Sequence, residues 1–374
     1  MSIKVWAATT GWMLVTVAVC AQEANEFDVT IEEKQNKIID RGGKGAYGSV
    51  LSKLANFVSL NGFADNELHV TEDEVSFDQH EVNLFVSAEF SSQLTSEFNI
   101  DFKESGEEIE VEYAFLDYEF NRSLIIRGGK FLLPTSDFNE YSWLPYVNRM
   151  VEAPLSIVAS PNEWSSVGLQ LRGKLGAENA KVTPFYAAYI VNGLGQPGEI
   201  EEEEDEIFSV LNGLSEAGEG EDNNKFKDFG AQFGVEFGDG FSLSTYYHYS
   251  RYDSSADLAA GIYGVSAGFD NGKLHVSGEY HNSSYDKREE DAPSVIEEGE
   301  VSGYFLLGAY KIHDRWEPGF RLDGATIEGE DITRYTLGMN YYFGTTRLLK
   351  FNVGQWSHED EEEAFMELGL IFSF

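Results

Sequence analysis

Cysteine is almost absent from the sequence, which contains only Cys20. This residue lies in an N-terminal stretch that begins Met-Ser-Ile-Lys and continues through the apolar run from Val5 to Val19. The pattern is typical of a secretory signal peptide cut after Ala21. A lipid anchor on Cys20 is the alternative, although Val19 stands where a lipoprotein has a small residue. The processed chain then has no thiol, which excludes a disulfide framework, a haem attachment site and an iron–sulfur cluster.

Basic residues are also scarce, because 26 Lys and Arg stand against 65 Asp and Glu, for a formal net charge of −39. A surface this acidic repels phosphate backbones, which excludes nucleic acid as a partner. The 8 prolines and 5 methionines are few, whereas 37 glycines, 19 tyrosines and 27 phenylalanines favour strands over helical bundles. A hydrophobic content of 42% is too high for a disordered chain.

Long apolar runs are absent after the N-terminal stretch, so no transmembrane helix is predicted. Export without a helical anchor leaves a periplasmic protein, a secreted protein or a membrane barrel. Segments of about 10 residues alternate apolar with small or polar side chains, as expected of barrel strands. Phe229, Phe233 and Val235, for example, alternate with Gly230 and Gln232. A soluble sandwich would alternate too, so this pattern alone does not settle the class.

The connections between these segments favour a membrane barrel. Those after even-numbered strands are mostly tight turns, such as Gly238-Asp239-Gly240 and Asp270-Asn271-Gly272, and those after odd-numbered strands are mostly longer. Outer-membrane barrels have short periplasmic turns and longer external loops, and an even strand count puts both termini in the periplasm. We therefore predict an all-β chain that forms a transmembrane antiparallel β-barrel of sixteen strands: 55–68, 78–90, 94–103, 109–120, 122–131, 165–175, 180–192, 226–237, 241–252, 258–269, 273–285, 300–311, 316–326, 333–343, 347–357 and 363–374.

The last predicted strand places Leu368, Leu370, Phe372 and Phe374 at every second position. A terminal Phe on such a strand resembles the assembly signal of bacterial outer-membrane barrels, so we expect the barrel assembly machinery, outer-membrane lipid and lipopolysaccharide as partners. An ordinary edge strand that happens to end in Phe is the alternative. The expected organisation is a signal peptide (1–21), a periplasmic N-terminal extension (22–54) and the barrel (55–374).

The segment Leu124–Pro134, followed by Asn139-Glu140 and by Asn148–Leu155, resembles the porins of the O and P type. The similarity covers roughly residues 55–175 and fades beyond them to shared barrel architecture. That family comprises sixteen-stranded, usually trimeric outer-membrane porins, some of them phosphate-selective. The resemblance implies a homotrimer in the bacterial outer membrane. It also implies a ladder of lumenal Arg and Lys in the phosphate-selective members, and this sequence shows no such ladder.

The loop 132–164 follows the fifth predicted strand, which makes it the third external loop. In sixteen-stranded porins this loop folds into the barrel and narrows it. Its four prolines lower the entropy lost on ordering, and aromatic residues such as Phe138 and Trp143 supply apolar area that can pack on the wall. We expect the loop inside the lumen. A loop lying over the rim or against a neighbouring subunit is the alternative.

Strand parity assigns polar residues to the lumenal wall, opposite the apolar outer band. Acidic residues on the inserted loop would face the basic ones across the constriction, and opposed charges in a narrow pore orient dipolar solutes. The alternative is that each Arg pairs with a wall carboxylate such as Glu97, Asp101 or Asp117. The predicted pore-lining and constriction residues are Arg127, Asp137, Glu140, Arg149, Glu152, Gln170, Arg172, Arg321, Asp323 and Lys350.

The loop Leu194–Asn224 holds eleven acidic residues and no Lys or Arg. Such a run is usually a solvated loop, because like charges repel. Together with 289–291 and 360–363, it could alternatively bind Ca²⁺ or Mg²⁺ that bridges to lipopolysaccharide phosphates. None of these loops has the spaced ligand pattern of a specific calcium site, so we expect no metal site and no cofactor.

These features predict a porin that is a passive diffusion channel for small hydrophilic solutes, biased toward cations or neutral molecules by its acidic charge. One alternative is a phosphate- or anion-selective porin. Another is a barrel that sheathes a partner such as an electron-transfer cytochrome. Parity points His248, His275 and His281 inward, but no Ser-centred motif or catalytic carboxylate pair accompanies them, so we expect no enzymatic activity.

Overall fold

The computed structural model describes residues 58–71, 75–103, 106, 108–161, 164–195, 210–219, 224–238, 240–253, 258–288, 296–327, 329–358 and 361–374. The predicted signal peptide, the predicted N-terminal extension and the predicted barrel residues 55–57 lie outside this range. So do residues 196–209 of the acidic loop.

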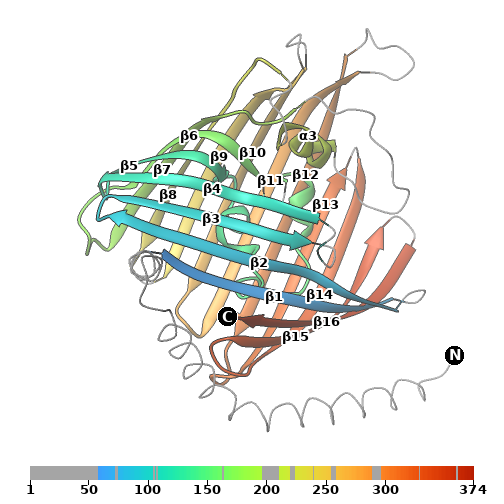
Figure 1. Ribbon diagram of the computed structural model, residues 1–374. Helices are drawn as coiled ribbons and strands as arrows, with labels where there is room; N and C mark the ends of the chain where they lie inside the picture. Colours follow the sequence, from blue (N-terminus) through green and yellow to red (C-terminus); the bar gives the residue numbers. More distant parts are fainter. Residues whose placement is uncertain are drawn as a thin grey trace, which may run out of the picture. The chain divides into compact units, whose positions relative to one another are not determined.

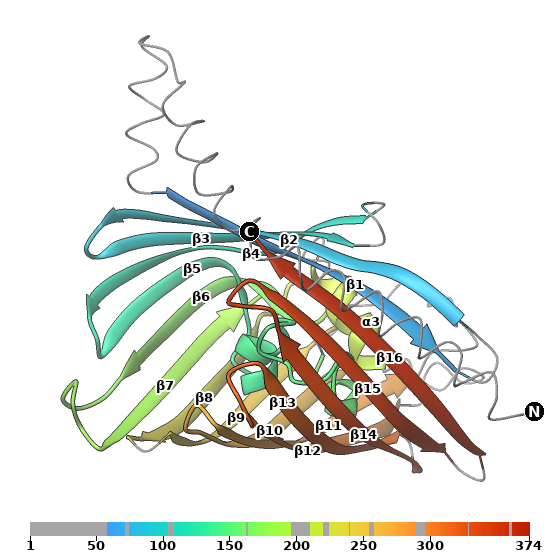
Figure 2. The same cartoon turned by 90° about the horizontal axis from the view of Figure 1, so that it is seen from below.

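Sixteen strands form one closed antiparallel barrel, in which each strand pairs with its neighbours in the sequence and β1 pairs with β16 (Figures 1 and 2). This confirms the predicted fold class and strand count. Closure is required in lipid, where an open sheet edge would leave backbone groups unpaired. The strands are β1 (Val58–Val70), β2 (Val75–Ser91), β3 (Leu94–Lys103), β4 (Glu108–Asn121), β5 (Leu124–Leu132), β6 (Ser165–Lys174), β7 (Val182–Val191), β8 (Asp228–Phe237), β9 (Phe241–Arg251), β10 (Ala259–Asp270), β11 (Leu274–Arg288), β12 (Ile296–Tyr310), β13 (Trp316–Ile327), β14 (Glu330–Tyr342), β15 (Arg347–His358) and β16 (Glu361–Ser373).

The two faces of the sheet differ as the alternation predicts. On β8, Phe229 and Phe233 are 53% and 52% exposed, whereas Asp228 and Gln232 are buried. Exposed aromatic and aliphatic side chains recur in this way around the ring, on β6, β9, β13 and β14 among others. An apolar outward face and a polar inward face are the arrangement of an outer-membrane barrel.

Several strands are longer than predicted at the end that carries the connections after odd-numbered strands. β12 begins at Ile296 instead of 300, and β11 ends at Arg288 instead of 285. The connections after β13 and β15 are consequently only 328–329 and 359–360. The predicted difference in length between the two sets of connections therefore depends mainly on the connections after β5 and β7. The sequence analysis missed these extensions because it followed the alternation of apolar residues. Beyond the lipid, strand pairing continues through acidic residues such as Glu297.

The connection between β5 and β6 lies against the lumenal face of the barrel. It contains a π-helical turn, η2 (Phe138–Ser142), and a 3-10 turn, η3 (Leu155–Val158). The backbone N–H of Phe138 donates to Glu279 Oε1 on β11 at 3.0 Å, and η3 contacts β11, β12 and β13. Figure 2 shows these short helical turns within the ring of strands. The loop therefore occupies the lumen rather than the rim.

The connection between β7 and β8 carries a helix that the sequence analysis missed, α3 (Val210–Glu219; Figure 1). Its Leu211 and Leu214 are buried in an apolar cluster with Leu133 and Trp164 of the inserted loop and Tyr252, which directly follows β9. The expectation of a wholly solvated acidic loop is therefore wrong for residues 210–219. The sequence analysis missed α3 because its three large apolar residues, Val210, Leu211 and Leu214, lie in a loop that is dominated by acidic residues. Among the described residues, no helix is long and apolar enough to cross a membrane.

The end of the chain completes the ring. Phe374 donates its backbone N–H to the carbonyl of Gly62 at 2.9 Å, and Gly62 donates to the carbonyl of Phe374 at 3.0 Å. A Cβ atom at Gly62 would lie 2.6 Å from the Phe374 ring, so a glycine is needed at this junction. The Phe374 side chain is nevertheless 59% exposed.

We expect Phe374→Ala to reduce the amount of barrel inserted into the outer membrane of cells several-fold. The variant keeps both backbone hydrogen bonds and loses only outward-facing apolar area, so the refolded barrel should lose about 1 kcal/mol of stability at most. Phe372→Ala, on the same face, is the matched control and should insert like the wild type. Immunoblots of outer-membrane fractions and melting in detergent measure the two effects. Equal losses in both assays would contradict an assembly role for Phe374.

Candidate functional site

Two arginines on neighbouring strands bind the backbone of the inserted loop. Arg321 on β13 donates to the carbonyl oxygens of Glu152 at 2.8 Å and Ala153 at 3.1 Å, and Arg334 on β14 also donates to Ala153. Asp323 pairs with both guanidinium groups, and its Oδ1 lies 2.9 Å from Arg334 Nε. All three side chains are at most 2% exposed. Asp323 therefore offsets one of the two positive charges beneath the loop.

The same segment of loop is held by β14 and β15. Lys350 Nζ donates to the carbonyl of Met150 at 2.7 Å, and Asn340 Nδ2 donates to the carbonyl of Arg149 at 3.1 Å. The Arg149 guanidinium in turn lies 3.3 Å from a carboxylate oxygen of Glu317 on β13. Buried carbonyl groups need such donors, because an unpaired polar group inside a protein is costly. Side chains of three adjacent strands thus fix one stretch of loop backbone.

Arg334 and Asn340 were not among the predicted site residues, although strand parity could have found them. They alternate on β14 with Tyr335, Leu337 and Tyr341, which face outward or pack on outward neighbours. The signal was therefore present in the sequence. What parity cannot supply is the contact with the loop, which joins residues about 180 positions apart.

The remaining predicted basic residues of the wall also have acidic partners. Arg127 Nε lies 2.8 Å from Asp117 Oδ1 on β4, which is the wall pairing that the sequence left open. Arg172 Nη1 lies 3.3 Å from Glu140 Oε1 of the inserted loop and 3.3 Å from Gln170 Oε1. Arg172 and Glu140 therefore oppose each other as an ion pair between wall and loop. Charge-assisted contacts of this kind are stronger than neutral ones.

Two cavities flank Asp137, which lines both of them. The larger, about 680 Å³, is bordered by Arg172, Lys174 and Glu236 among others, and the smaller, about 140 Å³, by His275. Burial, together with the nearby carboxylates of Glu279, Glu140 and Glu236, raises the pKa of the Asp137 carboxyl to about 7. The charge at the boundary of the two cavities therefore changes near neutral pH.

Two of the three histidines that parity predicts to point inward, His248 and His281, connect the wall to the loop. Each has one ring nitrogen on a carboxylate and the other on a tyrosine hydroxyl. The Trp164 ring of the loop lies 4.5 Å from the ring of His248, and the carboxylate that binds His281 also accepts the N–H of Phe138. The two sets are Asp228, His248 and Tyr189, with both distances 3.0 Å, and Glu279, His281 and Tyr246, with distances of 3.0 and 2.9 Å.

No family model matches the chain. An alignment over 164 positions, which covers 41% of this chain and 36% of the relative's length, is 30% identical to an uncharacterized protein of Aquifex aeolicus. The fold resembles solved porins despite low identity. An anion-selective porin of Comamonas acidovorans matches with a TM-score of 0.60 at 10% identity, over 85% of this chain and 99% of that one. OmpF of Salmonella typhi matches with 0.60 at 14%, over 85% and 97%.

A trimer form of OmpT, an outer-membrane protein of Vibrio cholerae, matches with a TM-score of 0.55 at 13% identity, over 85% of this chain and 99% of that one. Identities this low establish the fold alone. The chain accordingly has the closed sixteen-stranded barrel of bacterial outer-membrane porins. A barrel with an apolar outer band of this kind belongs in the bacterial outer membrane.

We expect Arg321→Met to loosen the inserted loop and to destabilise the barrel by about 3 kcal/mol. The substitution removes the donor to the carbonyl of Glu152, leaves the carbonyl of Ala153 with Arg334 alone, and removes one partner from a buried ion-pair cluster. Residues 149–158 should then exchange their amide protons faster, and single-channel currents should become larger and noisier. Arg251→Met, at an exposed position, is the matched control. Identical behaviour of the two variants would contradict the anchoring role.

The raised pKa of Asp137 predicts that ion selectivity changes with pH. The carboxyl is neutral below its pKa of about 7 and negative above it, so the preference for K⁺ over Cl⁻ should increase between roughly pH 6 and pH 8. Asp137→Asn should abolish this increase while leaving the preference at low pH unchanged. Reversal potentials in planar bilayers at several pH values measure the effect. An increase of the same size in Asp137→Asn would show that another group titrates.

Proposed function

We propose that the protein is a porin, a passive channel through which small hydrophilic solutes diffuse across the outer membrane. We propose further that it favours cations and neutral molecules over anions. The observation that carries this selectivity is the pairing of the lumenal basic side chains. Arg321, Arg334 and Lys350 bind loop carbonyls or Asp323, and Arg172 pairs with Glu140. Basic groups engaged in this way attract a passing anion less than free ones do.

The wall formed by β1 to β4 adds negative charge. Lys103 is the single Lys or Arg of residues 58–121, and its Nζ lies 3.0 Å from Glu110 and 3.1 Å from Glu112. Carboxylates along a pore raise the local concentration of cations and repel anions, an effect that is screened beyond about 10 Å at 0.1 M salt. The buried or half-buried carboxylates of this wall are Asp65, Glu67, Glu81, Asp101, Glu110, Glu112 and Asp117.

An anion-selective channel is the second candidate. Residues 124–155 resemble phosphate-selective porins of the O and P type, and one solved structure with this fold is titled an anion-selective porin. Arg334 adds a basic residue on β14 to those of the lumenal wall. The set is then more similar to the Arg and Lys ladder of the phosphate-selective porins. These residues would have to release the loop carbonyls to meet an anion, and we therefore rank this candidate second. A sheath around a partner protein fits less well, because the inserted loop and α3 already fill part of the lumen.

The proposal includes a homotrimer, in line with the trimer form of the Vibrio protein that shares the fold. It also includes contact of the apolar outer face with lipid and lipopolysaccharide, and insertion by the barrel assembly machinery with Phe374 as part of the signal. It includes no enzymatic activity and no cofactor. The inward histidines support this, since His248 and His281 hold the wall through carboxylate and tyrosine partners.

Reversal potentials across planar bilayers in asymmetric KCl test the selectivity. We expect the wild type to favour K⁺ over Cl⁻, most clearly at low salt, where charges are least screened. Glu140→Gln leaves Arg172 without its loop carboxylate and should reduce the K⁺ preference several-fold. Glu178→Gln, exposed in the turn after β6, is the matched control and should change little. Strong Cl⁻ or phosphate selectivity in the wild type would favour the anion-selective candidate instead.

A further inference from the structure

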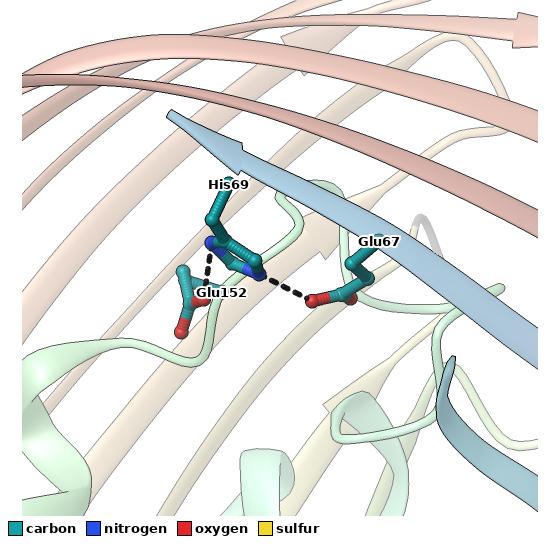
Figure 3. A group of neighbouring side chains, drawn as sticks. All are labelled: Glu67, His69 and Glu152. Carbon is teal, nitrogen blue, oxygen red and sulfur yellow. Dashed lines mark hydrogen bonds and ion pairs between the residues drawn. The ribbon is translucent and has the colours of Figure 1, made fainter. Parts of the chain in front are cut away.

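Glu67 and His69 on β1 lie beside Glu152 of the inserted loop (Figure 3). His69 Nε2 is 3.0 Å from Glu67 Oε2, and His69 Nδ1 is 3.6 Å from Glu152 Oε1. One donor atom from each of the three residues lies within 4.8 Å of the other two. This group was not predicted, because Glu152 is some 80 positions from β1 in the sequence and only the folded loop brings it there.

The surrounding contacts hold all three residues in place. Glu67 and His69 are two positions apart on one strand, so both point into the lumen. The carbonyl of Glu152 accepts a hydrogen bond from Arg321 at 2.8 Å, which fixes the loop at this residue. Glu367 on β16 is directly opposite His69 in the strand register and adds a further carboxylate next to the group. The site is therefore built from the wall and an anchored loop, not from flexible surface side chains.

We propose that Glu67, His69 and Glu152 form a binding site for a divalent transition-metal ion of the Zn²⁺ class. One imidazole nitrogen and two carboxylate oxygens form a donor set that suits Zn²⁺, whereas Ca²⁺ and Mg²⁺ prefer oxygen donors alone. The 3.6 Å separation of His69 Nδ1 and Glu152 Oε1 is close to the distance of about 3.4 Å between two ligands of a tetrahedral ion with bonds of about 2.1 Å.

The exposure of the three side chains fits an ion that enters from the lumen. The side chains of His69 and Glu152 are 30% and 39% exposed, whereas that of Glu67 is 6% exposed. Lumenal water can therefore reach the first two residues and fill the fourth coordination position. The two carboxylates balance the charge of the ion.

Binding would fasten the inserted loop to β1, which only β16 separates from the loop's anchors on β13 to β15. The metal would thus extend the anchoring of the loop by a further strand and would act on the shape of the channel rather than on its charge alone. This inference is independent of the proposed ion selectivity, because the site can bind metal whichever ion the channel favours.

Titration calorimetry of the full chain in detergent, stripped with a chelator, tests the site directly. Zn²⁺ should bind with a stoichiometry of one per chain in a background of excess Mg²⁺, which occupies oxygen-only sites. His69→Ala should remove this binding, and Glu152→Gln should weaken it roughly tenfold or more. His358→Ala is the matched control, because His358 Nε2 also lies near a carboxylate, 3.5 Å from Glu330 Oε2, at an exposed position. It should bind Zn²⁺ like the wild type.

Amide exchange supplies a second readout that shows whether the variants are folded. Zn²⁺ should slow the exchange of residues 149–155 in the wild type and in His358→Ala, but not in His69→Ala, while the strands of all three exchange alike. Absence of one-to-one binding in the wild type would overturn the proposal. So would Zn²⁺ binding that survives His69→Ala with unchanged affinity, which would place the ion on other acidic residues and leave His69 as an ion-pair bridge between two glutamates.

Discussion

The pairing of every strand edge is the constraint from which the rest of this structure follows. A sheet in lipid has no water to satisfy its backbone, so it closes, and here β1 meets β16 with Gly62 and Phe374 completing the ring. Closure gives the sheet an inside and an outside, and the alternation of side chains then fills them differently. The outward face is apolar, and the inward face collects the charged residues of a very acidic chain.

The inserted loop determines how those inward charges are used. A loop that packs on the inner wall of a barrel buries some of its backbone carbonyls, and those carbonyls need donors. Arg321, Arg334, Lys350 and Asn340 supply the donors, so basic groups that could have faced the channel hold the loop instead. The wall of β1 to β4 adds many carboxylates, because Lys103 is the single Lys or Arg of residues 58–121. The negative charge that a solute meets in the lumen is therefore greater than a count of acidic and basic residues would indicate.

Several independent contacts keep this loop in place. Apolar packing with α3 and the wall buries Leu133 and Trp164, and two histidines flanked by carboxylates and tyrosines support the wall beneath them. The basic residues of β13 to β15 hold the loop from one side, and the group formed by Glu67, His69 and Glu152 lies at β1. A channel whose constriction is fixed from several directions can have a defined size and charge.

The sequence by itself determined the export signal pattern, the strand count and which side chains share a face, because alternation and turn residues are local properties. It also placed Arg127, Arg172, Arg321 and Lys350 on the lumenal wall. Only the tertiary structure decided what each of them contacts, since the loop that meets them is distant in the sequence and its path depends on packing. For the same reason parity could place Glu67 and His69 on the lumenal face of β1, whereas their meeting with Glu152 depends on the fold of the loop across the lumen.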